Sequence, residues 1–348
     1  MTQTITDSGA ATVQTVRRPN RLRLLWLLVL VVAVIALALA SVAVGSRDVS
    51  WDDIIAGLSG RVENLSQGAV QTRLPRTVLA ILVGAALGLA GAVMQGVTRN
   101  PLADPGILGV NMGASLAIVA SIAWFGLSSA SAYIWTAIAG AAVAAVFVYV
   151  VGSLGRGGAT PLKLALAGAA TSAALASFVT AISLPRADIS ATIRSWQIGG
   201  VGGATFDSIG LVIPFLLVGF LLSLTSGRGL NSLALGDDLA AGLGERVAAT
   251  RGLAALGAVV LAGAATALAG PIGFVGLVVP HFFRLIFGPD YRWLLPFSAA
   301  GGAALLLLAD ILGRIIARPS EIDVGILTAL IGGPVFIAIV RRQKVREL

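Results

Sequence analysis

The sequence predicts an all-α polytopic membrane protein with about ten transmembrane helices. Of its 348 residues, 57% are hydrophobic and only 11% are charged, whereas a soluble domain carries roughly a quarter charged residues. The apolar residues also gather in blocks close to the roughly 20 residues that cross a bilayer as a helix. These ten blocks lie at about 24–44, 74–97, 108–125, 131–152, 161–184, 207–225, 250–270, 274–287, 293–315 and 323–341.

The chain begins with a polar segment. Residues 1–20 are rich in Thr, Ser and Gln, so we expect a disordered cytoplasmic tail there and a second short tail at 342–348. The apolar run Leu24–Val44 is longer than the core of a signal peptide, so we expect it to be retained as the first span. Residues 21–341 then make up one transmembrane domain.

The later blocks differ in length and glycine content. The 274–287 block is short, and Pro271 and Gly276 lie just before or within it. We therefore expect a kinked or half-buried eighth span that its neighbours shelter from lipid. In the second span, Gly84 and Gly88 stand four residues apart, a spacing that lets helices approach closely in a membrane.

The distribution of basic residues predicts the orientation. With the N-terminus inside and ten spans, 16 of the 24 Lys and Arg residues fall on inner segments and the other 8 on outer ones. Cytoplasmic loops carry such an excess of Lys and Arg. We therefore expect both termini in the cytoplasm.

The residue inventory excludes several classes of function. The chain has no cysteine and one histidine, His281, so no multi-histidine or thiolate metal site is expected. Its only lysines, Lys163 and Lys344, do not stand in a GxxxxGK[ST] P-loop, so any energy from ATP must come through a partner protein. The net charge of +8 comes from basic residues near the ends of apolar runs, without the basic face that would predict nucleic acid as a partner.

Two polar segments flank the second span. Arg73-Leu-Pro-Arg-Thr77 is expected at its outer mouth, with Pro75 in the first helical turn and the two arginines on one face. Interfacial snorkelling of these arginines is the alternative. The segment Met94–Gly109, with two prolines, is expected as a polar inner turn, and taken alone it is simply a rigid loop.

Three segments together resemble the FecCD family of ABC-transporter permeases: RLPRT, then GAVMQGVTRNPLADPGILGVNMGAS, then GPIGFVGLVVPHFFR. The resemblance runs from about Val70 to Arg341. It implies a dimer of ten-helix permease subunits around a central pore in the bacterial cytoplasmic membrane. The implied partners are a dimer of ABC ATPases, which binds ATP and magnesium, a substrate-binding lipoprotein or periplasmic protein, and a second permease subunit. No cofactor is expected on this chain.

The long inner loop between the sixth and seventh spans carries a further motif. Its leucines have helical spacing and its glycines interrupt them, which predicts two short helices with a turn at about 230–246. An exposed apolar side there needs something to pack against, and a membrane-surface helix is the alternative. The resemblance identifies the segment as coupling helices that dock on the ATPase, through Leu235, Gly236, Asp237, Asp238, Leu239, Ala240, Leu243 and Gly244.

At the outer face, the resemblance implies that Arg73, Arg76 and Arg314 meet acidic residues on the substrate-binding protein. The segment Arg194–Gly203, before the sixth span, is a candidate outer gate, and its tryptophan is equally well read as an aromatic-belt anchor. The candidate gate residues are Trp196, Gly199 and Gly200.

Two positions depart from the family pattern. In Glu321-Ile-Asp-Val-Gly325, Asp323 stands where family members commonly have proline, and Tyr291 stands where histidine is frequent. Asp323 brings a negative charge near the expected docking arginines. These departures suit one half of a heterodimer, which we favour over a homodimer.

The sequence thus predicts the permease subunit of a binding-protein-dependent ABC importer of ferric siderophores, which is not itself an enzyme. Haem or cobalamin importers of the same family are alternatives. An ion-coupled secondary transporter is the competing class, but it usually places ionisable groups at the membrane midplane, and here Asp310 lies near an outer helix end. His281 is expected to have a hydrogen-bonded structural role, and Arg284 to anchor the inner end of the eighth span.

Overall fold

The computed structural model describes residues 19–60, 62–155, 160–186, 193–194 and 196–344. The tail predicted at 1–20 lies outside these residues except for its last two, and so do the last four residues of the tail predicted at 342–348. Within the described ranges every regular element is a helix, which confirms the all-α class.

Ten helices in the described part of the chain correspond one to one with the ten predicted apolar blocks. Seven are long and apolar enough to cross a membrane, and α4, α12 and most of α14 are shorter apolar helices. The ten are α1 (Asn20–Ala43), α3 (Leu65–Thr98), α4 (Val110–Phe125), α5 (Ala130–Ser153), α6 (Pro161–Ser183), α8 (Phe206–Thr225), α11 (Val247–Ala269), α12 (Val275–Phe287), α13 (Tyr291–Ile316) and α14 (Val324–Lys344).

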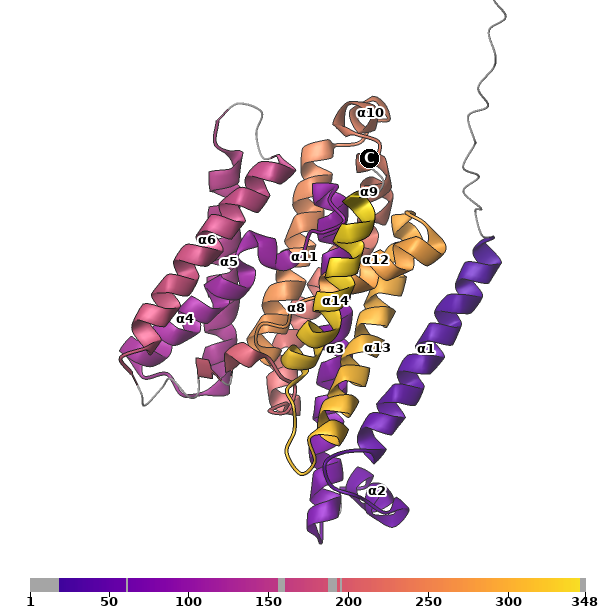
Figure 1. Cartoon of the computed structure of the whole chain (residues 1–348), viewed down its shortest axis with the longest axis vertical. Coiled ribbons are helices and arrows are strands. Elements are labelled where there is room, and N and C mark those ends of the chain that lie inside the picture. The colour runs from indigo at the N-terminus through magenta and orange to yellow at the C-terminus, as the bar shows by residue number, and fades with distance from the viewer. Residues whose placement is uncertain (1–18, 61, 156–159, 187–192, 195, 345–348) are drawn as a thin grey trace, which may run out of the picture.

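Short elements connect these helices: α2 (Trp51–Leu58), the 3-10 turn η1 (Pro105–Leu108), α9 (Gly227–Leu233) and α10 (Asp237–Gly242). The long helices lie side by side in one bundle (Figure 1). α9, α10, the start of α1 and the end of α14 lie at one end, which we call the α10 end. α2 and the loop between α13 and α14 lie at the opposite end, the α2 end.

The interior of the bundle is built around α3 and α13, which pack against each other along their length. Small residues make this possible. A Cβ atom added at Gly84 would lie 2.4 Å from the backbone oxygen of Gly302, and one added at Gly88 would lie 2.2 Å from that of Ser298. The two backbones therefore touch, as small residues allow in membrane helix pairs.

α3 is longer than its apolar block predicts. It has 34 residues, or about 51 Å at 1.5 Å per residue, so it extends well beyond the roughly 30 Å of a hydrocarbon core. Pro75 consequently lies inside α3, and its predicted place in the first helical turn is wrong. The prediction failed because Leu65–Thr72 is polar enough to end an apolar block, although it continues the helix.

α12 has 13 residues, which confirms the short eighth helix. It begins deep in the bundle, because a Cβ atom at Gly91 of α3 would lie 2.0 Å from the backbone oxygen of Gly276. Within an α-helix the carbonyl of Gly276 would accept a hydrogen bond from the N–H of residue 280, but residue 280 is a proline and has no N–H. The side-chain amide of Gln95 donates to Gly276 O instead, at 3.2 Å, so α3 supplies the partner that the proline removes.

Candidate coupling and docking sites

The α10 end carries the two short helices expected there, α9 and α10, although the first begins at Gly227, earlier than predicted. Three leucines of this segment, Leu235, Leu239 and Leu243, are 57%, 63% and 69% exposed. Large apolar side chains grouped on one exposed segment are typical of an interaction site. We call these three side chains the leucine surface.

Asp237, at the start of α10, attaches the segment to two long helices. Its carboxylate accepts a hydrogen bond from Arg251 of α11 at 2.9 Å and pairs with Arg99 at 3.2 Å. Arg99 is the C-cap of α3 and has a left-handed backbone conformation. The start of α10 is therefore tied to the ends of α3 and α11. The other predicted coupling residues include the buried Ala240 and the exposed Asp238 and Gly244.

A second connection at this end was not predicted from the sequence. Asp290, the N-cap of α13, accepts a hydrogen bond from Asn231 of α9 at 2.7 Å. Arg23 of α1 donates to the backbone oxygen of Phe287 and lies 3.7 Å from the Asp290 carboxylate. Hydrogen bonds from Arg292 lower the pKa of Asp290 to about 2, so the carboxylate stays charged at neutral pH. We call this group the Asp290 junction.

At the α2 end, two arginines cap the end of α1. Arg73 and Arg314 donate to the four backbone carbonyls of residues 41–44 at 2.8 to 3.1 Å. The last carbonyls of a helix have no partner within it, and positive charge is favourable at a helix C-terminus. The two arginines are 5% and 1% exposed, so both side chains are buried in this capping arrangement.

The third predicted arginine, Arg76, lies between two carboxylates. Its guanidinium contacts Asp310 at 2.8 Å and Glu321 at 2.5 Å. Asp310 is fully buried, and its other oxygen pairs with Arg314 at 2.7 Å. Burial would raise the pKa of Glu321, but the hydrogen bond and charge of Arg76 lower it below its ordinary value. The structure thus brings the three arginines into one group with two acids, Asp310 and Glu321, that the sequence reasoning did not include.

The candidate gate residues lie in a close backbone junction. Gly199 has φ +77°, and its carbonyl accepts a hydrogen bond from the N–H of Gly325 at 2.9 Å. The N–H of Gly200 donates to the last residue of α11 at 2.8 Å, and Trp196 is half-buried. This segment therefore joins the end of α11 to the start of α14. Ser195 of the predicted gate segment lies outside the described residues.

His281 and Arg284 differ in their contacts. Arg284 donates to the side chain of Gln95 at 2.8 Å and so connects α12 to α3. Nδ1 of His281 is buried without a hydrogen-bond partner in the described part of the chain, so this nitrogen does not supply the hydrogen bond expected of the histidine. Among the described residues, no three His, Asp or Glu side chains gather as metal ligands do.

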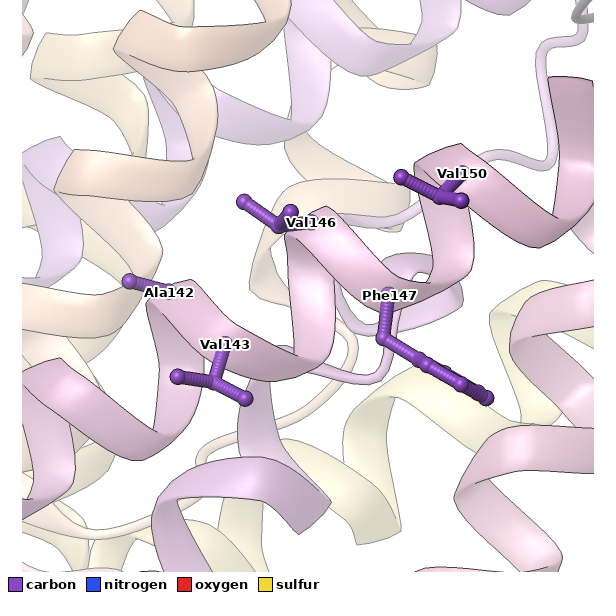
Figure 2. A pocket seen from close by; sticks show the side chains of 5 residues that line it. All are labelled: Ala142, Val143, Val146, Phe147 and Val150. Carbon is purple, nitrogen blue, oxygen red and sulfur yellow. The ribbon is translucent and has the colours of Figure 1, made fainter.

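One outward face of α5 forms a shallow groove. Its lining is wholly apolar and comes from a single helix: Ala142, Val143, Val146, Phe147 and Val150 (Figure 2). Figure 2 shows the valine and phenylalanine side chains projecting away from the helix axis. Such a face suits contact with lipid, whose tails are as apolar as these side chains, and offers no polar group to orient a bound solute.

Similarity to known proteins decides the family. Residues 28–342 match the family model described as the FecCD transport family. The chain belongs to the FecCD transport family. It is 44% identical to the ferric enterobactin transport system permease protein FepD of Escherichia coli, over 87% of this chain and 91% of FepD. It is 41% identical to the Fe(3+)-citrate import system permease protein YfmD of Bacillus subtilis, over 95% of this chain and 98% of YfmD.

A solved structure described as a metal-chelate type ABC transporter in an inward-facing conformation has the same fold. Its TM-score is 0.80 at 28% sequence identity, covering 92% of this chain and 99% of that one. This FecCD protein is therefore a multi-pass membrane permease of a bacterial ABC importer, as the three sequence motifs predicted. The roles of its individual site residues remain predictions.

Proposed function

We propose that this permease carries ferric siderophores across the bacterial cytoplasmic membrane, driven by ATP hydrolysis on a partner ATPase dimer. The observation that supports the substrate class best is the 44% identity to a ferric enterobactin permease over nearly the whole length of both chains. Haem and cobalamin permeases of the same family are the alternatives. An ion-coupled secondary transporter is not favoured, because the family consists of ABC permeases.

In this proposal the α10 end faces the cytoplasm and the leucine surface docks on the ATPase, which holds ATP and magnesium. A short segment with three exposed leucines provides an apolar patch for a groove. Asp237 supports the interaction indirectly, because its pairs with Arg99 and Arg251 fix α10 on two long helices. Movement of the ATPase subunits would then reach α3 and α11 through these contacts.

The α2 end would then face outward and receive the substrate-binding protein, around the group formed by Arg73, Arg76 and Arg314. Carboxylates on that protein would pair with arginine there, and such pairs fix orientation and speed encounter. A second permease subunit completes the pore, and we favour a different chain over a second copy. The acid at position 323, where relatives commonly have proline, would make the two outer faces of a heterodimer unequal.

The chelate would pass through intact. The chain has no cysteine and one histidine, so its pore walls offer no set of soft ligands that would strip a metal from its chelator. Selection would rest on the shape of the path and on the binding protein. The junction around Trp196, Gly199 and Gly200 is the proposed outer gate, because it joins α11 to α14 where a change of packing would open a path between helices.

Uptake by cells that lack this permease tests the proposal. Labelled ferric siderophores would be compared with labelled haem and cobalamin, and loss of siderophore uptake alone, restored by the wild-type chain, is the expected result. Loss of haem or cobalamin uptake instead would identify that compound as the substrate in place of a ferric siderophore. Unchanged uptake of all three would contradict the chelate proposal.

The coupling role has its own test. Leu239→Asp places a charge in the leucine surface, and we expect it to abolish co-purification of the ATPase with the tagged permease. Leu58→Asp on α2, where the leucine is 53% exposed at the opposite end, is the matched control and should leave co-purification unchanged. Equal recovery of ATPase with both variants would place the coupling surface elsewhere.

A further inference from the structure

The three arginines at the α2 end differ in the contacts that each would have to break in order to bind a partner protein. Arg73 and Arg314 cap the last carbonyls of α1, and Arg73 also donates to the carbonyl of Arg47 at 2.6 Å. Leaving these bonds would deprive the partly buried carbonyls at the end of α1 of their donors and, for Arg314, would take one of its two arginine partners from the buried Asp310. An unsatisfied buried polar group is costly, so neither side chain is free to bind a partner.

Arg76 is placed differently. One of its carboxylate partners, Asp310, is fixed in α13, is fully buried and also pairs with Arg314. The other, Glu321, lies on the loop between α13 and α14, with its side chain 36% exposed. Besides its pair with Arg76, Glu321 accepts a hydrogen bond from the hydroxyl of Ser46 at 2.9 Å. The Arg76 side chain is only 12% exposed, but it retains Asp310 as a partner when Glu321 leaves. The Arg76–Glu321 pair is thus the part of the group that can open without leaving a buried charge unpaired.

We infer that Arg76 is the arginine that binds the substrate-binding protein, and that Glu321 occupies it until an incoming carboxylate takes its place. This inference rests on the proposed function. The exchange conserves charge, since one carboxylate replaces another on the same guanidinium, while Asp310 keeps Arg76 in position throughout. Arg73 and Arg314 act as positioning residues, because they hold the end of α1 beside the loop that carries Glu321.

A competing internal acid has a measurable consequence. Docking affinity contains the cost of breaking the Arg76–Glu321 pair, so removing the charge of Glu321 should strengthen docking. Partly exposed pairs of this kind are worth up to about a fivefold change in an equilibrium constant. A simple increase in positive charge on this face would also strengthen docking, but it would not depend on Arg76.

The experiment measures the dissociation constant of the substrate-binding protein of the same transport system, identified by co-purification, for the intact permease–ATPase complex in lipid nanodiscs. Glu321→Gln should tighten binding by about two- to fivefold, and Glu321→Ala provides a second variant if the glutamine disturbs the loop. Asp48→Asn is the matched control, because Asp48 is an exposed acid on the same face that pairs with Arg318 at 3.1 Å. It should change binding less than twofold.

The double variant decides the mechanism. Arg76→Gln should weaken docking, and in that background Glu321→Gln should have no further effect, as expected for two residues that act through one pair. Equal tightening by Glu321→Gln with and without Arg76, or no tightening in the single variants, would overturn the exchange. Absence of any binding by the wild-type complex would instead contradict the docking part of the proposed function.

Discussion

Replacement of Arg314 by methionine tests whether this arginine is chiefly a structural cap. The side chain is 1% exposed, pairs with Asp310 at 2.7 Å and donates to the backbone carbonyls of Ser41 and Val44 at 2.8 and 2.9 Å. Arg314→Met keeps an unbranched, flexible side chain, shorter than arginine, but removes the guanidinium and every donor. Breaking a buried ion pair from one side costs about 3–5 kcal/mol. Because Asp310 keeps Arg76 as a partner, we expect the lower value, about 3 kcal/mol.

The assay is the thermal unfolding of the purified permease in detergent, followed by loss of helical signal. Arg318→Met is the matched control, since Arg318 lies four residues further on, pairs with the 92% exposed Asp48 and donates to the carbonyl of Gly45 at 2.6 Å. An exposed pair contributes about 0–1 kcal/mol and one hydrogen bond about 1 kcal/mol, so this control should lose clearly less stability than Arg314→Met. If the unfolding temperatures of Arg314→Met and Arg318→Met agree within experimental error, the capping role deduced from the contacts is wrong.

Two further predictions concern helix packing and the Asp290 junction. Gly88→Ala should destabilise the permease by about 1–3 kcal/mol through overpacking against α13, whereas Gly210→Ala in α8, where an added Cβ meets no atom within 4 Å, should be neutral or stabilising in the same unfolding assay. Asp290→Asn should cost about 1 kcal/mol, because a pKa of about 2 in place of 3.8 corresponds to roughly 2.5 kcal/mol before solvent screening. The lowered pKa adds stability above about pH 4 that is lost as the pH falls toward 2. The difference from wild type should therefore be the same at pH 7 and pH 5, and a difference that already disappears at pH 5 would contradict this assignment.

The sequence predicted the spans well because apolar block length is a direct physical requirement of the bilayer. It failed where a polar segment is nevertheless helical, as in the first turns of α3 before Pro75. It also missed α2, although Ser50 and Asp53 form a capping box there and their spacing is a recognisable helix-start signal.

Of the group at the α2 end, the sequence predicted the arginines but not the acids. The arginines stood in recognisable motifs, whereas the acids that pair with them did not. Arg76 and Asp310 are separated by 234 positions in the chain, so no local pattern relates them. The four-residue spacing of Asp310 and Arg314 was a usable signal for an ion pair on one helix face. The bond from Asn231 to Asp290 depends on the fold alone, since it joins two elements 59 positions apart.

α13 runs from the α10 end of the molecule to the α2 end and makes polar contacts at both. Its first residues are held by the Asp290 junction, and Asp310 and Arg314 lie in its last two turns. With 26 residues it is about 39 Å long. A rotation of about 10° around the Asp290 junction would therefore displace its far end by roughly 7 Å, more than one helical turn. Because the backbone of α3 touches that of α13, the two helices would rotate together. A small movement at one face of the membrane would then become a large one at the other face.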